Sequence, residues 1–136
     1  MIRAMQWDGV AAALARHVVV AKDPRALVVT VRDALRIRAE CVRAFDEDWL
    51  LVIAPVCPEA RASLRDALVS NMTIALAATA IEQGWLVLRA THPLAALDAA
   101  ALDRVVRFVS EEALRLRAIY LPNGTTVDRA LGHFSE

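Results

Sequence analysis

A long helical stripe of apolar residues is the feature that most constrains how this chain can fold. Between Asp98 and Tyr120, apolar side chains recur at the three- and four-residue spacing of one helix face. They are Leu102, Val105, Val106, Val109, Ala113, Leu116 and Tyr120. Asp98 is a good N-cap, and Pro122-Asn123-Gly124 stops the pattern. The sequence therefore predicts a long amphipathic helix with one buried face.

Three strands are predicted in the first half of the chain. Residues 26–32 are a β-branched run, residues 35–42 alternate apolar and polar side chains, and residues 49–56 are almost wholly apolar. Their connections are too short for crossovers, so we expect antiparallel neighbours. A helix over residues 5–16, with Trp7, Val10 and Leu14 on one face, comes before them.

A helix and a hairpin are predicted before the long helix. Pro58 suits a first helical position, and this helix should end near Ser70 and Asn71. Residues 72–80 alternate bulky and small side chains, which predicts a strand, and residues 85–91 form its return strand after a Gln83-Gly84 turn.

The resulting fold class is α+β, with a five-stranded antiparallel sheet and the order α-β-β-β-α-β-β-α. We expect the first and last helices to cover one face of that sheet. The side chains expected to be buried are Leu35, Ile37, Leu51, Ile53, Ile74, Val105, Val109 and Leu116.

The chain of 136 residues is long enough to bury one core without disulfides or metals. We expect a single domain over residues 1–136, with a core over 1–120 and a tail over 121–136. In the tail, Val127, Leu131 and Phe134 lie at i, i+4 and i+7. That spacing is compatible with a short docked helix or with a disordered end.

Charge and hydropathy argue against nucleic acid and membrane partners. Sixteen basic residues balance sixteen acidic ones, so the chain has no long-range attraction to phosphate backbones or anionic lipids. The longest apolar runs are far shorter than the ~20 residues of a spanning helix. No export signal is recognised at the N-terminus, and the expected location is cytoplasmic.

Catalytic patterns are missing from the sequence. His17, His92 and His133 are scattered, and neither Cys41 nor Cys57 lies at ligand spacing from them, so no metal site is expected. The four glycines form neither a P-loop nor a dinucleotide-binding turn, and no cofactor is expected. A thiol at Cys57, before a predicted helix, is the best catalytic candidate, but a structural role is favoured. We expect that the protein is not an enzyme.

Several short segments, taken with the element order up to Tyr120, resemble a known family. They are the strand Trp49–Val56, the helix end Leu68–Asn71, the hairpin strand Gly84–Arg89 and the Leu97-Asp98 step before the final helix. The sequence resembles the type III secretion chaperone-like (Tir chaperone-like) superfamily. This resemblance implies a small homodimer that holds a segment of a secretion substrate in a non-globular state.

Three hypotheses for function follow. The leading one is a dimeric chaperone or adaptor that binds a non-globular segment of a bacterial client protein. The second is a dimeric regulatory module of the same fold without a secretion client. The third is a small enzyme that uses the Cys57 thiol or the acidic turn at residues 46–48.

Two surfaces are predicted for these partners. The strand Leu27–Val31 is expected near a sheet edge, where a client could add as a further strand. The candidate client-binding residues are Trp7, Val28, Thr30 and Val42. The chain is 57% hydrophobic, more than one core of this size is expected to hide, so we expect a self-association surface. The candidate dimer contacts are Leu64, Leu68, Thr73, Ala75 and Ala77.

Overall fold

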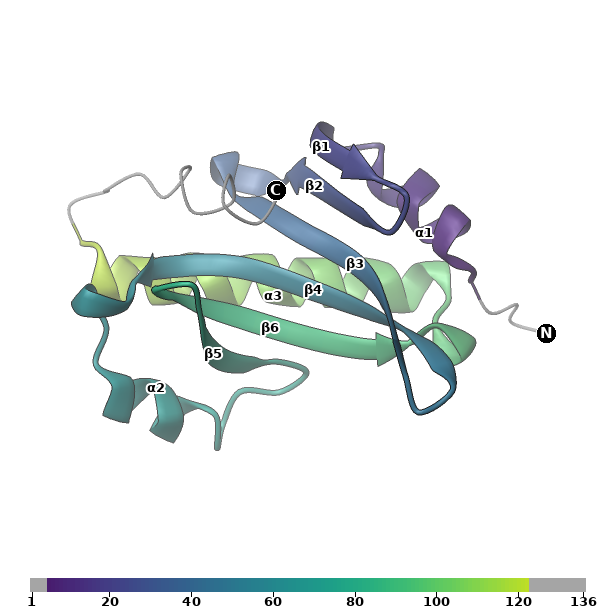
Figure 1. The fold of residues 1–136 in the computed structure, drawn as a ribbon. Helices are drawn as coiled ribbons and strands as arrows, with labels where there is room; N and C mark the ends of the chain where they lie inside the picture. The colour runs from purple at the N-terminus through teal and green to yellow at the C-terminus, as the bar shows by residue number, and fades with distance from the viewer. Residues whose placement is uncertain (1–4, 123–136) are drawn as a thin grey trace.

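The computed structural model describes residues 5–122 and shows one antiparallel sheet with a long helix across one face (Figure 1). In chain order the elements are α1 (Trp7–Leu14), β1 (Val18–Asp23), β2 (Ala26–Thr30), a 3-10 turn (Arg32–Ala34), β3 (Arg36–Ala44), β4 (Glu47–Pro58), a second 3-10 turn (Glu59–Arg61), α2 (Leu64–Ser70), β5 (Ala78–Glu82), β6 (Trp85–Pro93), a third 3-10 turn (Leu94–Ala96) and α3 (Ala99–Tyr120). The α+β class and the antiparallel arrangement are confirmed.

The sheet has six strands in the order β1-β2-β3-β4-β6-β5, so the prediction of five strands is wrong. The additional strand is β1, which pairs with β2 and places it one position inside the sheet. Its valines, Val18, Val19 and Val20, do not alternate with polar residues, and a bulge between Val19 and Ala21 interrupts its register. A strand of this kind carries little period-two signal, which explains why the sequence analysis missed it.

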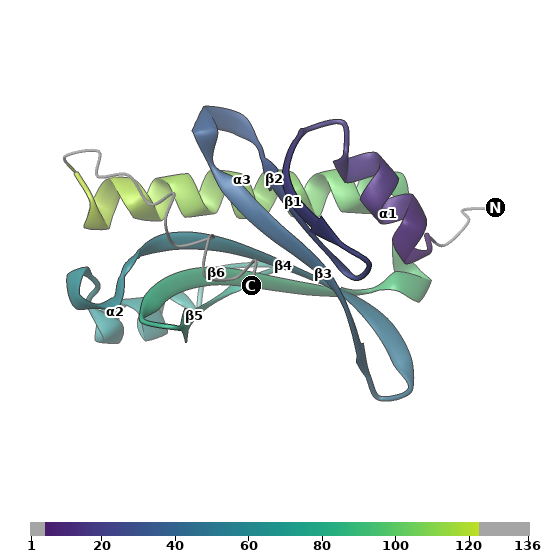
Figure 2. The same cartoon turned by 45° about the horizontal axis from the view of Figure 1, so that its top comes forward.

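The last helix is the best-predicted element. The Asp98 carboxylate accepts a hydrogen bond from the Ala101 amide at 2.7 Å, as expected of an N-cap. Near its other end, Arg117 donates to the Pro55 carbonyl at 2.9 and 3.1 Å and joins α3 to β4. Figure 2 shows α3 along one side of the sheet, with α1 beside its N-terminal part.

The main core lies between α3, α1 and one face of the sheet. Val10 and Leu14 of α1 are buried in it, with the inward side chains of the strands and α3. Seven of the eight predicted core residues are buried: Leu35, Ile37, Leu51, Ile53, Val105, Val109 and Leu116. Ile74 is only half-buried, because it lies in a turn and not in a strand.

The second face of the sheet carries its own small cluster. Leu51, Ile53 and Val87 are buried there, and the described residues that pack against them all come from strands or their ends. Leu51 and Ile53 are therefore buried, as predicted, on the face that points away from α3. We call this surface the second face of the sheet.

Segments around α2 differ from the prediction. Strand β4 continues through Pro58, and α2 begins only at Leu64, where the Ser63 hydroxyl accepts a hydrogen bond from the Asp66 amide. Residues 71–77 form turns instead of the predicted strand, and β5 begins at Ala78. The Asn71 side-chain oxygen accepts hydrogen bonds from the amide and the hydroxyl of Thr79 at 2.7 and 2.9 Å. These bonds hold the turns against β5.

No helix in residues 5–122 has both the length and the apolar composition needed to cross a membrane. Of the predicted C-terminal tail over residues 121–136, only Leu121 and Pro122 lie within the described part of the chain.

Candidate protein-binding surfaces

The two edges of the sheet are β1 and β5, and the edge next to the predicted strand Leu27–Val31 is formed by β1. Val18 is 69% exposed, and Val19 and Val20 are each more than 40% exposed. Within residues 5–122, β1 pairs only with β2, so the backbone groups on its other side are open to an added strand. A run of β-branched side chains on an open edge is suited to strand addition by another polypeptide.

Two of the predicted client-binding residues lie inside the sheet rather than at its edge. Val28 faces the second face of the sheet, as expected, but it is only 3% exposed because it lies between Ala21 on β1 and Arg38 on β3. Thr30 is half-buried at the end of β2. An aspartate at position 28 would therefore be buried and would disturb the fold.

The other two predicted client-binding residues are separated by the sheet. Val42 is half-buried beside the cluster on the second face. Trp7 packs against the main core, and its indole N–H donates to the Pro24 carbonyl at 3.0 Å. The structure therefore does not bring Trp7, Val28 and Val42 onto one binding surface.

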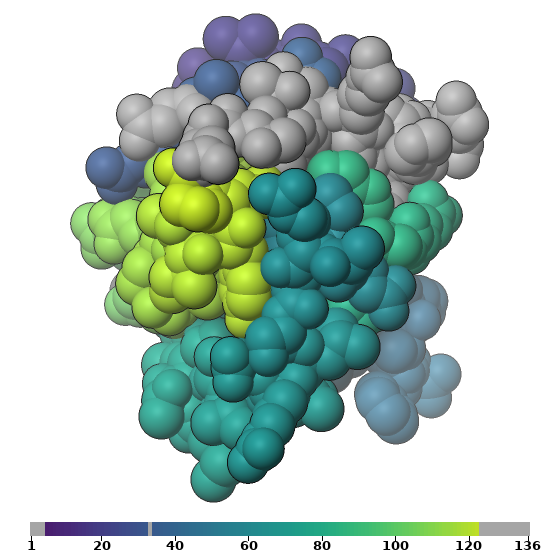
Figure 3. Space-filling view, turned by 90° about the vertical axis from the view of Figure 1, so that its left-hand side faces the viewer, coloured from purple at the N-terminus to yellow at the C-terminus, as the bar shows by residue number. Residues whose placement is uncertain are grey.

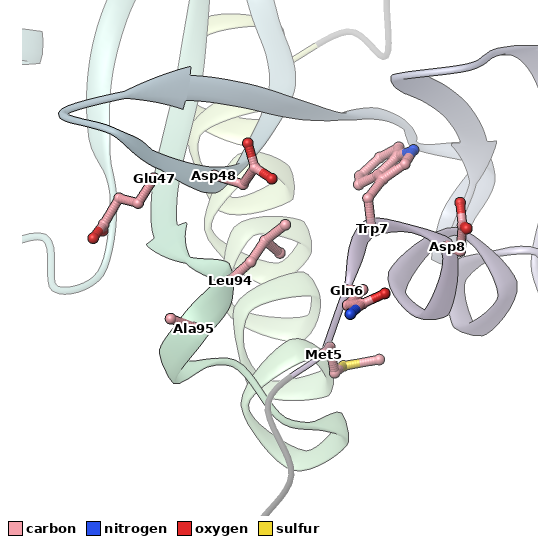
Figure 4. A pocket seen from close by; sticks show the side chains of 8 residues that line it. All are labelled: Met5, Gln6, Trp7, Asp8, Glu47, Asp48, Leu94 and Ala95. Atoms are coloured by element: carbon pink, nitrogen blue, oxygen red, sulfur yellow. The ribbon is translucent and has the colours of Figure 1, made fainter.

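Trp7 instead borders a cavity of about 420 Å³ between α1, the β3–β4 hairpin and the start of the third 3-10 turn (Figure 4). Its lining residues are Met5, Gln6, Trp7, Asp8, Glu47, Asp48, Leu94 and Ala95. Asp48 is already paired with Arg43 at 3.3 Å and with Arg25 at 3.6 Å. Within the acidic turn, the Asp48 carboxylate is therefore engaged in surface ion pairs.

A second exposed surface lies on α2 and the turn after it. Leu68 is 69% exposed and Met72 is 86% exposed, with Leu64 and Val69 about half exposed beside them. We call Leu64, Leu68, Val69 and Met72 the α2 patch. Figure 3 shows α2 on the surface at the end of the molecule where α3 also ends.

The predicted dimer contacts are divided by this arrangement. Leu64 and Leu68 are exposed on α2, as a contact surface requires. Thr73 and Ala75 are exposed and Ala77 is half-buried, but they lie in turns and do not form the predicted small face of a strand. Val69 and Met72 were not predicted as contacts, and Met72 was assigned to the bulky face of the predicted strand.

The two thiols are buried and unsuited to nucleophilic chemistry. Cys57 lies within β4, not at a helix N-terminus, and burial raises its pKa more than nearby Arg61 lowers it. Burial likewise raises the pKa of Cys41, whose sulfur accepts a hydrogen bond from Arg25 at 3.2 Å. Both groups are therefore mostly protonated near neutral pH, which argues against a thiol enzyme. Among residues 5–122, no three His, Cys, Asp or Glu side chains gather as a metal site would require.

Comparison with known proteins gives structural neighbours only. No family model matches the sequence, and no curated protein is significantly similar to it. The fold is similar to a chain of the HopA1–SchA chaperone–effector complex, with a TM-score of 0.62 at 15% identity over 82% of this chain and 89% of that one.

Two further neighbours are secretion-system proteins solved with a bound protein. One comes from the complex of the Yersinia pestis type III secretion chaperone SycH with a YscM2 fragment: its TM-score is 0.60 at 14% identity, over 81% of this chain and 95% of that one. The other comes from the ExoU–SpcU heterodimer of the Pseudomonas aeruginosa type III secretion system: its TM-score is 0.61 at 18% identity, over 82% of this chain and 98% of that one. The predicted resemblance is confirmed at the level of the fold: this chain has a type III secretion chaperone-like fold.

Proposed function

We propose that this protein is a dimeric chaperone or adaptor that holds a non-globular segment of a client polypeptide. The likeness to chains solved in chaperone–effector and chaperone–fragment complexes supports a client-binding role. The buried, protonated thiols and the ion-paired Asp48 carboxylate give no support to a catalytic alternative.

The open β1 edge is the observation that carries this proposal. Val18, Val19 and Val20 are exposed on a strand with one unpaired side in the described structure. A client segment paired with β1 would satisfy those backbone groups and would bury valine side chains against its own. Such binding needs an extended, unfolded segment, which is what a chaperone of this kind would hold.

The α2 patch is the proposed contact between two copies. Its four apolar side chains are exposed on one short helix and the turn that follows it. Exposed groups of this kind mark association surfaces, and a twofold contact would pair the patch with itself. The patch and the β1 edge belong to different ends of the sheet order, so one copy could use both surfaces together.

Co-expression with the proteins encoded by neighbouring genes tests the client-binding proposal. We expect one of them to co-purify with this chain, and replacement of Val18 and Val20 by lysine should abolish that association. The matched control is Ile119→Lys, which adds a charge at an exposed apolar position on α3. Retention of the client by the double β1 variant would contradict strand addition at this edge.

A further inference from the structure

A groove on the second face of the sheet is not used by either proposed surface. It runs along β5 and β6 and consists of two adjoining hollows of about 300 and 340 Å³, both lined by Ala80 and Arg89. We call it the Arg89 groove. Leu76 and Thr91 border its first hollow, and Ile53 and Val87 form the apolar floor of the second.

Strand register places Arg89 at the centre of this groove. Ala78 on β5 and Ile53 on β4 are its direct cross-strand neighbours, so an arginine lies between a small and an apolar side chain. Arg89 is exposed, and the structure gives it no ion pair within residues 5–122. Arg38, by contrast, already meets Glu40 at 3.2 Å and Glu82 at 3.0 Å.

The charge of the first hollow is one-sided. Arg89 is the only charged side chain among the described residues that line it, and the remaining lining residues are alanines, threonines and Leu76. An acidic side chain placed there would meet the guanidinium beside small and apolar side chains. A basic side chain would be repelled. The second hollow also holds two carboxylates, Glu40 and Glu82, and both are paired with Arg38.

Leu76 adds a second observation at the same place. Its backbone has φ of 67°, in the left-handed region that branched apolar residues rarely adopt, and its side chain is 54% exposed. Ala34, Phe45, Asp46 and Gln83 share this conformation elsewhere, so the position of Leu76 beside the groove is what matters here. Here that conformation leaves an apolar side chain at the mouth of the groove, available to a bound partner.

We propose that the Arg89 groove binds an extended, acidic segment of a partner polypeptide. Its carboxylate pairs with Arg89, and the side chains two residues before and after it contact Val87 and Leu76. Successive side chains of an extended segment alternate, so positions i, i+2 and i+4 face the groove together. This inference rests on the proposed client-binding function and assigns a chemistry to one part of the client.

Two labelled peptides test the groove with the full-length protein. One has the core Leu-Ser-Asp-Ser-Val, and the other has lysine in place of aspartate; fluorescence anisotropy measures their affinities. The Asp peptide should bind up to about fivefold more tightly, the upper end of what an exposed ion pair contributes. Arg89→Glu should reverse this preference, whereas Arg104→Glu, at an exposed position on α3, should leave it unchanged.

Each other outcome overturns the assignment. Equal affinity of the two peptides, or an Asp preference that survives Arg89→Glu, would show that Arg89 does not select the ligand. A change of sedimentation mass in Arg89→Glu would identify a second copy of this chain as the occupant instead. If neither peptide binds while the client still co-purifies with Arg89→Glu, the groove inference fails and the β1-edge proposal stands.

Discussion

Arg38 on β3 donates a hydrogen bond to Glu82 on β5 at 3.0 Å, although β4 and β6 lie between their strands. Three strand spacings on a flat sheet amount to about 14 Å, so the contact requires a sheet that curves toward this face. Arg38 is only 6% exposed and also meets Glu40 at 3.2 Å. Its side chain thus ties the two sides of the second face together above Ile53 and Val87, which line the same hollow.

Removing this arginine should destabilise the fold. Arg38→Ala leaves Glu40 and Glu82 without their shared partner and uncovers apolar side chains, so we expect a loss of about 2 kcal/mol in unfolding free energy. Arg38→Met keeps an apolar stem and should lose less. Urea unfolding measures both, with Arg104→Ala as the exposed control expected to change stability by less than about 0.5 kcal/mol. Equal stability of Arg38→Ala and the control would contradict the bridging role.

The Asn71–Thr79 contact gives a second stability prediction. The Asn71 oxygen accepts a hydrogen bond from the Thr79 amide at 2.7 Å, and the single hydroxyl proton of Thr79 is shared between that oxygen and the Ala67 carbonyl, each at 2.9 Å. Asn71→Ala leaves a partly buried amide without its acceptor, so we expect a loss of about 1–2 kcal/mol in unfolding free energy. Hydrogen exchange should also accelerate at the β5 amides. Unchanged exchange at Thr79 would contradict this account of how the turns are held.

Sequence periodicity located the elements that have a strong one-sided pattern. The stripe from Leu102 to Leu116 and the alternation from Leu35 to Cys41 both predicted elements that the structure confirms. Each pattern is long, and burial on one side imposes it directly. The resemblance to secretion chaperones depended on these same elements and on the hairpin strand at Trp85.

The weaker elements could not be found in the same way. Three valines without alternation do not distinguish an edge strand from a loop, so β1 was missed and β2 was placed at the edge. The alternating small residues after Met72 suggested a strand, but hydrogen bonds to the Ser70 carbonyl and the Asn71 side chain form turns there instead. Such local side-chain bonds compete with strand pairing and depend on tertiary contacts.

The candidate surfaces, like the strands, were only partly predicted from the sequence. Leu64 and Leu68 are exposed because α2 contacts the sheet mainly through Ala67. Val28 could not be judged from sequence, because its burial depends on β1 on one side and Arg38 on the other. The Arg89 groove likewise exists only through the cross-strand register.

The buried thiols predict a loss of stability at high pH. Burial raises the pKa of Cys41 and Cys57 above the ordinary value of 9.0, so the folded state favours the protonated thiols. The stabilising contribution is complete below that ordinary value, begins to fall when the thiols of the unfolded chain ionise, and is lost as pH rises through the raised pKa of the folded state. Urea unfolding at neutral pH and at roughly pH 9.5 should show the decline. A Cys41→Ala, Cys57→Ala variant should show a smaller decline, and an identical one would assign the effect to other groups.

The α2 patch predicts the oligomeric state. If two copies associate through Leu68 and Met72, sedimentation at micromolar concentration should give about twice the 14.9 kDa of one chain. Leu68→Asp with Met72→Asp places charges in that contact, and because both side chains are more than two-thirds exposed, the monomer should remain folded. Ile119→Asp, an exposed apolar position on α3, is the matched control and should remain dimeric.

Circular dichroism of the double variant separates dissociation from unfolding. A dimer that persists in a folded double variant would move the contact elsewhere, and a monomeric unaltered protein would contradict the dimer itself.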